Sequence, residues 1–200
     1  MTNFDSYRDI LSKIRIAWNE AEEDIKLVEQ VSRKVVMPSV NELRYAGRRL
    51  AEILYMMETG APHEEAMVLY NDVKFNCLRA RHDAIDSVVS KISLDADAAV
   101  SKLGYDVILK AFPNFTQLFL KLDAINKNIA KSRKNRNDRE AIYATVSNSN
   151  LPDLVKLYNE FRASEPIMVG LAKNERRNKA ISYLLGATGV IVAIVTGILK

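Results

Sequence analysis

The stretch SYRDILSKIRIAWNEAEEDIKLVEQVSRKVV, residues 6–36, decides the fold class of the chain. Its apolar residues recur at alternating intervals of four and three, and Ser32 fills the one polar slot. This spacing predicts a helix roughly 46 Å long with a heptad seam. The seam fits packing against the chain's own next helices in a bundle, and an intermolecular coiled coil is the alternative. Its members are Tyr7, Leu11, Ile14, Trp18, Ala21, Ile25, Val28 and Val35.

Two more long helices are expected directly after this one. Pro38 disfavours helix at Met37, and Ser39 with Glu42 has the spacing of a capping box. The apolar seam of the second helix is Val40, Leu43, Gly47, Leu50, Leu54 and Met57. A third helix is predicted from about His63 to Ile92, followed by a shorter one capped by Ser93 or Asp95. Three long helices joined by short turns indicate an antiparallel bundle.

Charged groups on the first two helices offer a way to pair them. The second helix carries Arg44, Arg48 and Arg49 on its polar faces. An antiparallel first helix would bring an acidic group near them, namely Glu20, Glu22, Glu23 and Asp24. We therefore expect ion pairs between these two helices at the surface.

The stretch ISYLLGATGVIVAIVTGIL, Ile181 to Leu199, contains no charged residue. A helix of this length covers roughly 28 Å, close to the thickness of a bilayer's hydrocarbon core. We interpret it as a transmembrane helix, with a buried core helix as the alternative. Arg176, Arg177 and Lys179 precede it and favour the cytoplasmic side.

Within this stretch small residues recur every four positions, at Gly189, Ala193 and Gly197. Such a stripe lets helices approach closely, which predicts association in the membrane; simple anchoring is the alternative. The predicted fold is thus all-α, an elongated antiparallel helical bundle with a single C-terminal transmembrane helix. Its predicted parts are a cytoplasmic bundle at residues 1–166, a basic juxtamembrane helix at 167–180 and the anchor at 181–199. The predicted localisation is a single-pass membrane protein whose N-terminal domain is cytoplasmic.

The segment KNIAKSRKNRNDR, residues 127–139, loses the apolar period and gains positive charge. It is predicted to be an exposed loop. Such a loop could be merely solvated, or could bind anionic lipid or an acidic partner protein; nucleic acid is less favoured because no aromatic residue within it could stack on bases. The candidate binding residues are Lys127, Lys131, Arg133, Lys134, Arg136 and Arg139.

Patterns typical of catalysis or metal binding are missing from the sequence. The glycines outside the apolar stretch are far apart, so no phosphate-binding loop can form locally. His82 and Asp86, four residues apart, are expected to form a surface pair, and Cys77 is expected to be a buried small hydrophobe. No catalytic residue, metal ligand or cofactor is predicted.

The function expected from these features is association and not catalysis. The first hypothesis is a tail-anchored, self-associating membrane protein whose cytoplasmic domain senses or recruits a partner, with the lipid bilayer, a second copy and a protein as partners. Such a protein could be a membrane-perturbing effector of a bacterial defence or toxin system. The alternatives are a tethered, non-enzymatic adaptor or scaffold, and a helical enzyme with an unrecognised site.

Overall fold

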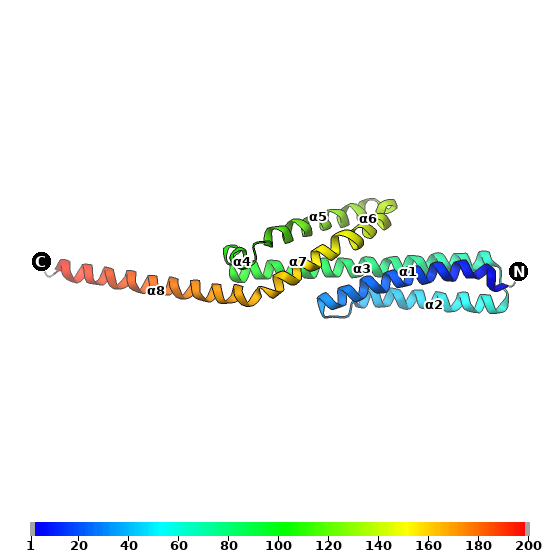
Figure 1. Ribbon diagram of the computed structural model, residues 1–200, viewed down its shortest axis with the longest axis horizontal. Helices are drawn as coiled ribbons and strands as arrows, with labels where there is room; N and C mark the ends of the chain where they lie inside the picture. The colour runs from blue at the N-terminus through cyan, green and yellow to red at the C-terminus, as the bar shows by residue number, and fades with distance from the viewer. Residues whose placement is uncertain (1–2, 199–200) are drawn as a thin grey trace. The chain divides into compact units, whose positions relative to one another are not determined.

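The computed structural model describes the backbone of residues 3–198 and, apart from Arg136, the side chains of residues 7–183. Over this range the backbone forms helices and short connections and no strand, so the all-α prediction is confirmed (Figure 1). The elements are α1 (Asn3–Ser32), α2 (Met37–Thr59), α3 (His63–Leu103), α4 (Tyr105–Ala111), α5 (Phe115–Lys134), η1 (Arg136–Asp138), α6 (Arg139–Thr145), η2 (Val146–Asn150), α7 (Leu151–Ala163) and α8 (Glu165–Ile198).

The transmembrane part of the predicted fold class is wrong, and the predicted single-pass membrane localisation is wrong with it. In the part of the chain that the structure describes, every helix is too short or too polar to span a bilayer. A crossing helix needs about 20 predominantly apolar residues in succession. The part of α8 whose side chains are described instead carries Lys173, Glu175, Arg176, Arg177 and Lys179. The remaining side chains of the predicted span, from residue 184 onward, lie outside the described residues.

The chain divides into two compact units, each of which is assembled from two stretches of sequence. Unit 1 comprises Met1–Leu94 and Lys121–Val155, and unit 2 comprises Asp95–Leu120 and Lys156–Lys200. In unit 1, α1 and α2 lie side by side and run in opposite directions (Figure 1). The hydroxyl of Tyr7, near the start of α1, accordingly donates to the carbonyl of Ala61, just past the end of α2, at 2.9 Å.

Most of the predicted seam of α1 belongs to the core of unit 1. Five of its members, Tyr7, Ile14, Ala21, Ile25 and Val28, are buried. Leu11 and Trp18 are only half-buried, and Val35 is exposed because α1 ends at Ser32. The seam therefore packs mainly against the chain's own helices.

The predicted seam of α2 is wrong by one position. The buried residues of α2 are Ser39, Glu42, Ala46 and Ile53, whereas Val40 and Leu54 are 39% and 43% exposed. Ser39 is no cap, because α2 begins at Met37 and its Oγ is buried without a hydrogen-bond partner. Glu42 instead forms an ion pair with Arg79 of α3 at 3.0 Å. Apart from Ile53, small and polar side chains thus fill the inner face of α2, and its other large apolar side chains lie toward the surface.

A buried ionic cluster joins α1, α3 and the helical turn η2. Arg81 of α3 donates from Nε to Asp24 Oδ2 and from Nη1 to Glu20 Oε2, both at 2.8 Å. Ser147 of η2 donates from Oγ to Asp24 Oδ1 at 2.6 Å. Glu20 and Asp24 of the acidic group are therefore paired with α3, and not with the arginines of α2 as the sequence suggested.

The serine and asparagine run at residues 147–150 does not break the helix as its composition would suggest. η2 is a turn of π-helix, and α6, η2 and α7 follow one another without a gap from Arg139 to Ala163. A π turn holds an extra residue, and such turns recur at sites with special requirements. Here the turn brings Ser147 to Asp24.

Unit 2 is built around aromatic side chains. Phe115 of α5 stacks on Phe161 of α7, with ring centroids 5.4 Å apart. The hydroxyl of Tyr158 donates to Asp95 of α3. Lys110 of α4 forms a 2.7 Å ion pair with Glu175 of α8. These contacts join α5 to α7, α7 to α3 and α8 to α4.

Candidate binding groove

Exposed aromatic and arginine side chains gather between α2 and α3 in unit 1. On α2, Tyr45, Arg48 and Arg49 follow one another at helical spacings of three and four, so they project from neighbouring faces. On α3, Asp72, Phe75 and Asn76 have the same spacing. The two sets line a hollow of about 390 Å³.

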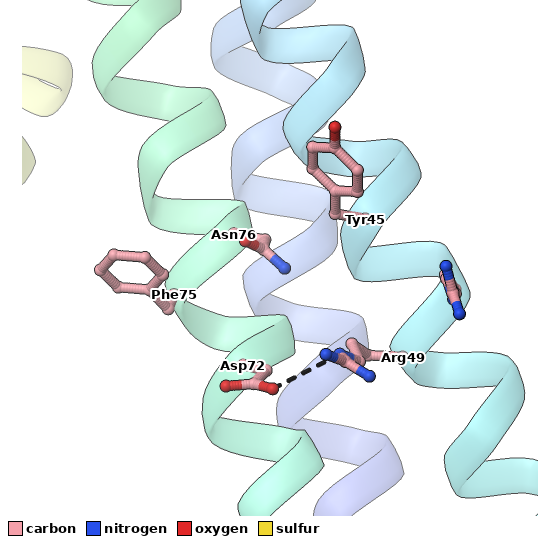
Figure 2. Close-up of a pocket in the computed structure, with 6 residues that line it drawn as sticks. Tyr45, Arg49, Asp72, Phe75 and Asn76 are labelled. Carbon is pink, nitrogen blue, oxygen red and sulfur yellow. Dashed lines mark ion pairs between the residues drawn. The ribbon is translucent and has the colours of Figure 1, made fainter.

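Figure 2 shows how these side chains are arranged. Asp72 and Asn76 point from α3 toward α2, and Arg49 reaches across to Asp72, with Nε 3.4 Å from Oδ2. Tyr45 lies at one end of the groove, and Phe75 projects from the side of α3 that faces away from α2 (Figure 2). Tyr45 and Phe75 are 50% and 58% exposed. Single exposed apolar side chains are common on protein surfaces, and what distinguishes these two rings is that both line one hollow together with arginines.

Arg48 and Arg49 both pair with the Glu52 carboxylate, which neutralises their charge only in part. Arg49 donates to Glu52 at 2.7 Å, and this hydrogen bond lowers the pKa of the Glu52 carboxyl below its ordinary value. The Arg48 side chain is 79% exposed and reaches the same carboxylate only at 3.5 Å. Two guanidinium groups therefore share Glu52, and Arg48 keeps most of its donors for another acceptor.

Two further arginines lie over the aromatic rings of the groove. The guanidinium of Arg44 lies 5.2 Å from the ring centre of Tyr45, and that of Arg79 lies 5.7 Å from the ring centre of Phe75. Cation–π contacts of this kind are worth about 0.5–1 kcal/mol at exposed sites. The rings and the charges thus form one surface that offers apolar area and hydrogen-bond donors together.

The side chains that line the groove offer charge, hydrogen-bonding groups and aromatic surface. Its lining residues are tyrosine, arginine, aspartate, phenylalanine and asparagine, and no histidine or cysteine is among them. Among the described side chains no group of three or more potential metal ligands comes together. Cys77 is 1% exposed, as predicted, and burial raises its pKa to about 11. The arrangement is suited to binding.

The predicted basic segment is not a loop, because α5 continues through Lys134 and η1 and α6 follow closely. Part of its charge is already used inside unit 1. Lys127 pairs with Asp123 at 2.6 Å, and Arg133 with Asp86 at 3.0 Å. Arg139 lies over the Tyr143 ring with its guanidinium 5.9 Å from the ring centre.

The other basic residues of this segment are less engaged. Lys131 and Lys134 are exposed, and Lys131 lines a separate hollow between α5 and α6. The side chain of Arg136 lies outside the described residues. Binding of anionic lipid or of an acidic partner by this segment stays a prediction.

The basic residues predicted to flank a membrane span have mixed roles. Arg176 donates to the carbonyl of Lys102 at 3.1 Å and so satisfies a backbone group near the C-terminal end of α3. Arg177 and Lys179 are exposed. The predicted association stripe, Gly189, Ala193 and Gly197, lies outside the residues whose side chains are described.

The expected surface pair of His82 and Asp86 does not exist. His82 is 6% exposed, neither ring nitrogen has a hydrogen-bond partner, and its ring lies against Tyr143 with centroids 3.8 Å apart. Burial, with the nearby charges of Arg139 and Arg81, lowers its pKa to about 4. Asp86 instead accepts from the Tyr143 hydroxyl at 2.7 Å, and burial together with this bond raises the pKa of Tyr143 to about 12.

The α2–α3 groove itself was missed in the sequence. Its residues come from two helices, and the sequence does not show which faces of those helices meet. One signal was present: Arg44 precedes Tyr45 directly, and Phe75 and Arg79 are four residues apart on one face.

No family model matches the chain, and comparisons with curated proteins and with solved structures find no significant match.

Proposed function

We propose that the chain is a non-enzymatic recruiting module whose α2–α3 groove binds an acidic segment of a partner protein. The observation that carries the proposal is the pairing of exposed aromatic rings, Tyr45 and Phe75, with arginines that retain free donors. Tyrosine and arginine are enriched among the residues that dominate protein–protein binding energy. The proposal keeps the adaptor role considered from the sequence and leaves out the membrane.

Acidic protein is favoured over nucleic acid by the carboxylates beside the groove. Asp72 lines it and Glu52 pairs with both Arg48 and Arg49. A phosphate backbone, with a charge at every nucleotide, would be repelled by these carboxylates as well as attracted by the arginines. A peptide that places a single carboxylate near Arg48 and an apolar side chain near Tyr45 brings less negative charge toward Glu52 and Asp72, so it meets less repulsion.

The test is selection from a random dodecapeptide display library against the full-length protein. We expect the enriched peptides to combine an aspartate or glutamate with an aromatic or leucine side chain. Arg48→Ala should weaken their binding about tenfold, because it removes the most exposed charge-assisted donor. Raising the salt concentration should weaken binding further.

A matched control separates the groove from general stickiness. Tyr55 lies on the same helix, is 66% exposed and lies outside the groove lining. Tyr45→Ala and Phe75→Ala should each reduce peptide binding, whereas Tyr55→Ala should leave it unchanged. Selected peptides without an excess of acidic residues, or equal losses in all three variants, would refute the proposal. Preferential binding of a single-stranded oligonucleotide at the same residues would refute it in favour of nucleic acid.

A further inference from the structure

A second hollow in unit 1 lies between α1 and α2, apart from the α2–α3 groove. It has a volume of about 390 Å³, and most of its lining is apolar. The lining residues are Leu11, Ile14, Arg15, Trp18, Asn19, Leu50 and Leu54. Leu54 is 43% exposed, and Leu11, Trp18 and Leu50 are half-buried. Leu50 and Leu54, two large apolar side chains of α2 that do not lie on its inner face, therefore line this hollow.

Charged residues on α1 follow this hollow at a regular interval. Arg8, Arg15, Glu22 and Glu29 recur every seven residues and so share one side of the helix. The sign of the charge reverses between Arg15 and Glu22, with Trp18 between them. Two such helices side by side in the same direction would place like charges opposite each other. In opposite directions, every arginine faces a glutamate.

These observations point to one occupant. We propose that a second copy of the chain covers the α1–α2 hollow, with its α1 antiparallel to the first about a twofold axis between Trp18 and Asn19. Arg15 of each copy then faces Glu22 of the other, and Arg8 faces Glu29, because both pairs are centred on the same point of the helix. An interface of this kind is isologous and closed, so it makes dimers and not filaments.

The contacts within one copy leave three of these four groups largely available, whereas Glu29 already accepts from the backbone N–H of Val36 at 3.3 Å with Oε1 and keeps Oε2 for Arg8. Arg15 is exposed and has no carboxylate partner among the described side chains. Glu22 pairs with Lys26 at 3.3 Å, but the two side chains are 47% and 64% exposed. An exposed pair on one helix is worth only a few tenths of a kcal/mol, so Glu22 can exchange it for Arg15 of a second copy.

The size of the face is sufficient for a dimer. The α1 segment from Arg8 to Glu29 is roughly 32 Å long, and two adjacent helices are about 20 Å wide. Such a face gives on the order of 1,300 Å² buried in total, which is within the range of specific interfaces. The apolar contacts of Trp18 and Leu54 would supply affinity, and the charges would fix the antiparallel direction.

Charge reversal tests the antiparallel pairing. Sedimentation equilibrium of the full chain should show a dimer that Arg15→Glu weakens about tenfold or more, since two attractive pairs become repulsive. Glu22→Arg should do the same. The double variant Arg15→Glu with Glu22→Arg restores opposite charges across the axis and should dimerise within about threefold of the original protein. Lys13→Glu, an equal change of charge on the other side of α1, should have no effect.

Cross-linking tests the position of the axis. Asn19→Cys places one thiol from each copy beside the axis, so a mild oxidant should join them rapidly. Ser12→Cys, also exposed on α1, would lie about 20 Å from its counterpart along the helix and should not cross-link. The native Cys77 is buried and does not compete.

Three results would contradict the proposed dimer or its axis. A protein that remains monomeric at about 100 μM overturns the proposal, as does a double variant that fails to recover the dimer while its helical circular dichroism is unchanged. Equal cross-linking at positions 12 and 19 overturns the axis. Because the peptide groove lies on the α2–α3 side, its failure or success is scored separately from these results.

Discussion

Replacing Arg81 by methionine should be among the most destabilising single changes in unit 1. Methionine keeps an apolar stem of similar length, so the change removes the charge and its bonds with little loss of packing. Asp24, whose side chain is 10% exposed, would then keep only the hydroxyl of Ser147 as partner. Removing one member of a buried ion pair costs about 3–5 kcal/mol because the other is left without compensation. The remaining Ser147 bond places the expected loss at the lower end, about 3 kcal/mol.

The assay uses the single tryptophan of the chain. Trp18 lies on α1, in the same unit as Arg81, so its fluorescence reports unfolding of that unit. With a slope of about 2 kcal/mol per molar urea, a loss of about 3 kcal/mol lowers the urea midpoint by about 1.5 M. The double variant Asp24→Asn with Arg81→Met leaves no buried charge and should lose only about 1 kcal/mol.

Lys127→Met is a control that separates the effect of burial from the effect of a short distance between the paired charges. Its ion pair with Asp123 is shorter, at 2.6 Å, than the 2.8 Å bonds of Arg81, but its side chain is 75% exposed against 12% for Arg81. The control should therefore cost less than about 0.5 kcal/mol. If Arg81→Met costs no more than Lys127→Met, burial does not set the strength of this cluster and the reasoning is refuted.

Three further changes test other parts of the chain. His82 has a pKa of about 4 in the folded protein against 6.5 in the unfolded chain, so between these pH values the unfolded chain binds more protons. The free energy of unfolding should therefore fall by about 2.5 kcal/mol from pH 6.5 to pH 4, and a His82→Phe variant with the same pH dependence would contradict this. Burial raises the pKa of the Cys77 thiol from 9.0 to about 11. At pH 8 it should therefore react with a thiol reagent about 100-fold more slowly in the folded protein than in urea, and equal rates would show that the thiol is accessible to solvent in the folded protein. Gly104→Ala should lower the free energy of unfolding by about 1 kcal/mol because φ at this residue is +82°. Gly170→Ala, inside α8 with open space around it, should raise the free energy of unfolding by about 0.5 kcal/mol. Melting temperatures that shift in the same direction for both variants would refute this backbone argument.

The seam of α1 could be predicted from the sequence, and that of α2 could not. In α1 the residues at heptad spacing are large and apolar, and Tyr7, Ile14 and Ile25 are buried as expected. In α2 the inner face contains Ser39, Ala46 and Glu42, which a search for large apolar residues passes over. Glu42 belongs inside only because Arg79 of α3 meets it there, and a single helix contains no trace of that partner.

The same limit applies to the polar clusters and to the candidate site. Asp24 resembles its exposed neighbours Glu22 and Glu23 in the sequence, yet it is the one that Arg81 and Ser147 bury. The α2–α3 groove depends on which side of α3 turns toward α2. The apolar stretch at the C-terminus was interpreted as a membrane span from its composition alone, and the helix that contains its first residues is not apolar enough over the described range to support that.

The π turn at Val146–Asn150 constrains how the chain can change in length. Polar segments rich in serine and asparagine ordinarily tolerate insertions and deletions, and an alignment would place gaps in them first. Here the deletion of one residue would convert the π turn into a regular α-helix and leave Tyr143 aligned with Leu151 and Leu154, because a π turn takes up one residue more than an α turn for about the same rotation. All three side chains are buried. A second deletion, or an insertion, has no such turn to absorb it and would rotate Tyr143 by about 100° relative to the other two, which would expose one side of the junction. This polar turn should thus tolerate the loss of one residue and no other change of length, with Ser147 among the residues that are kept.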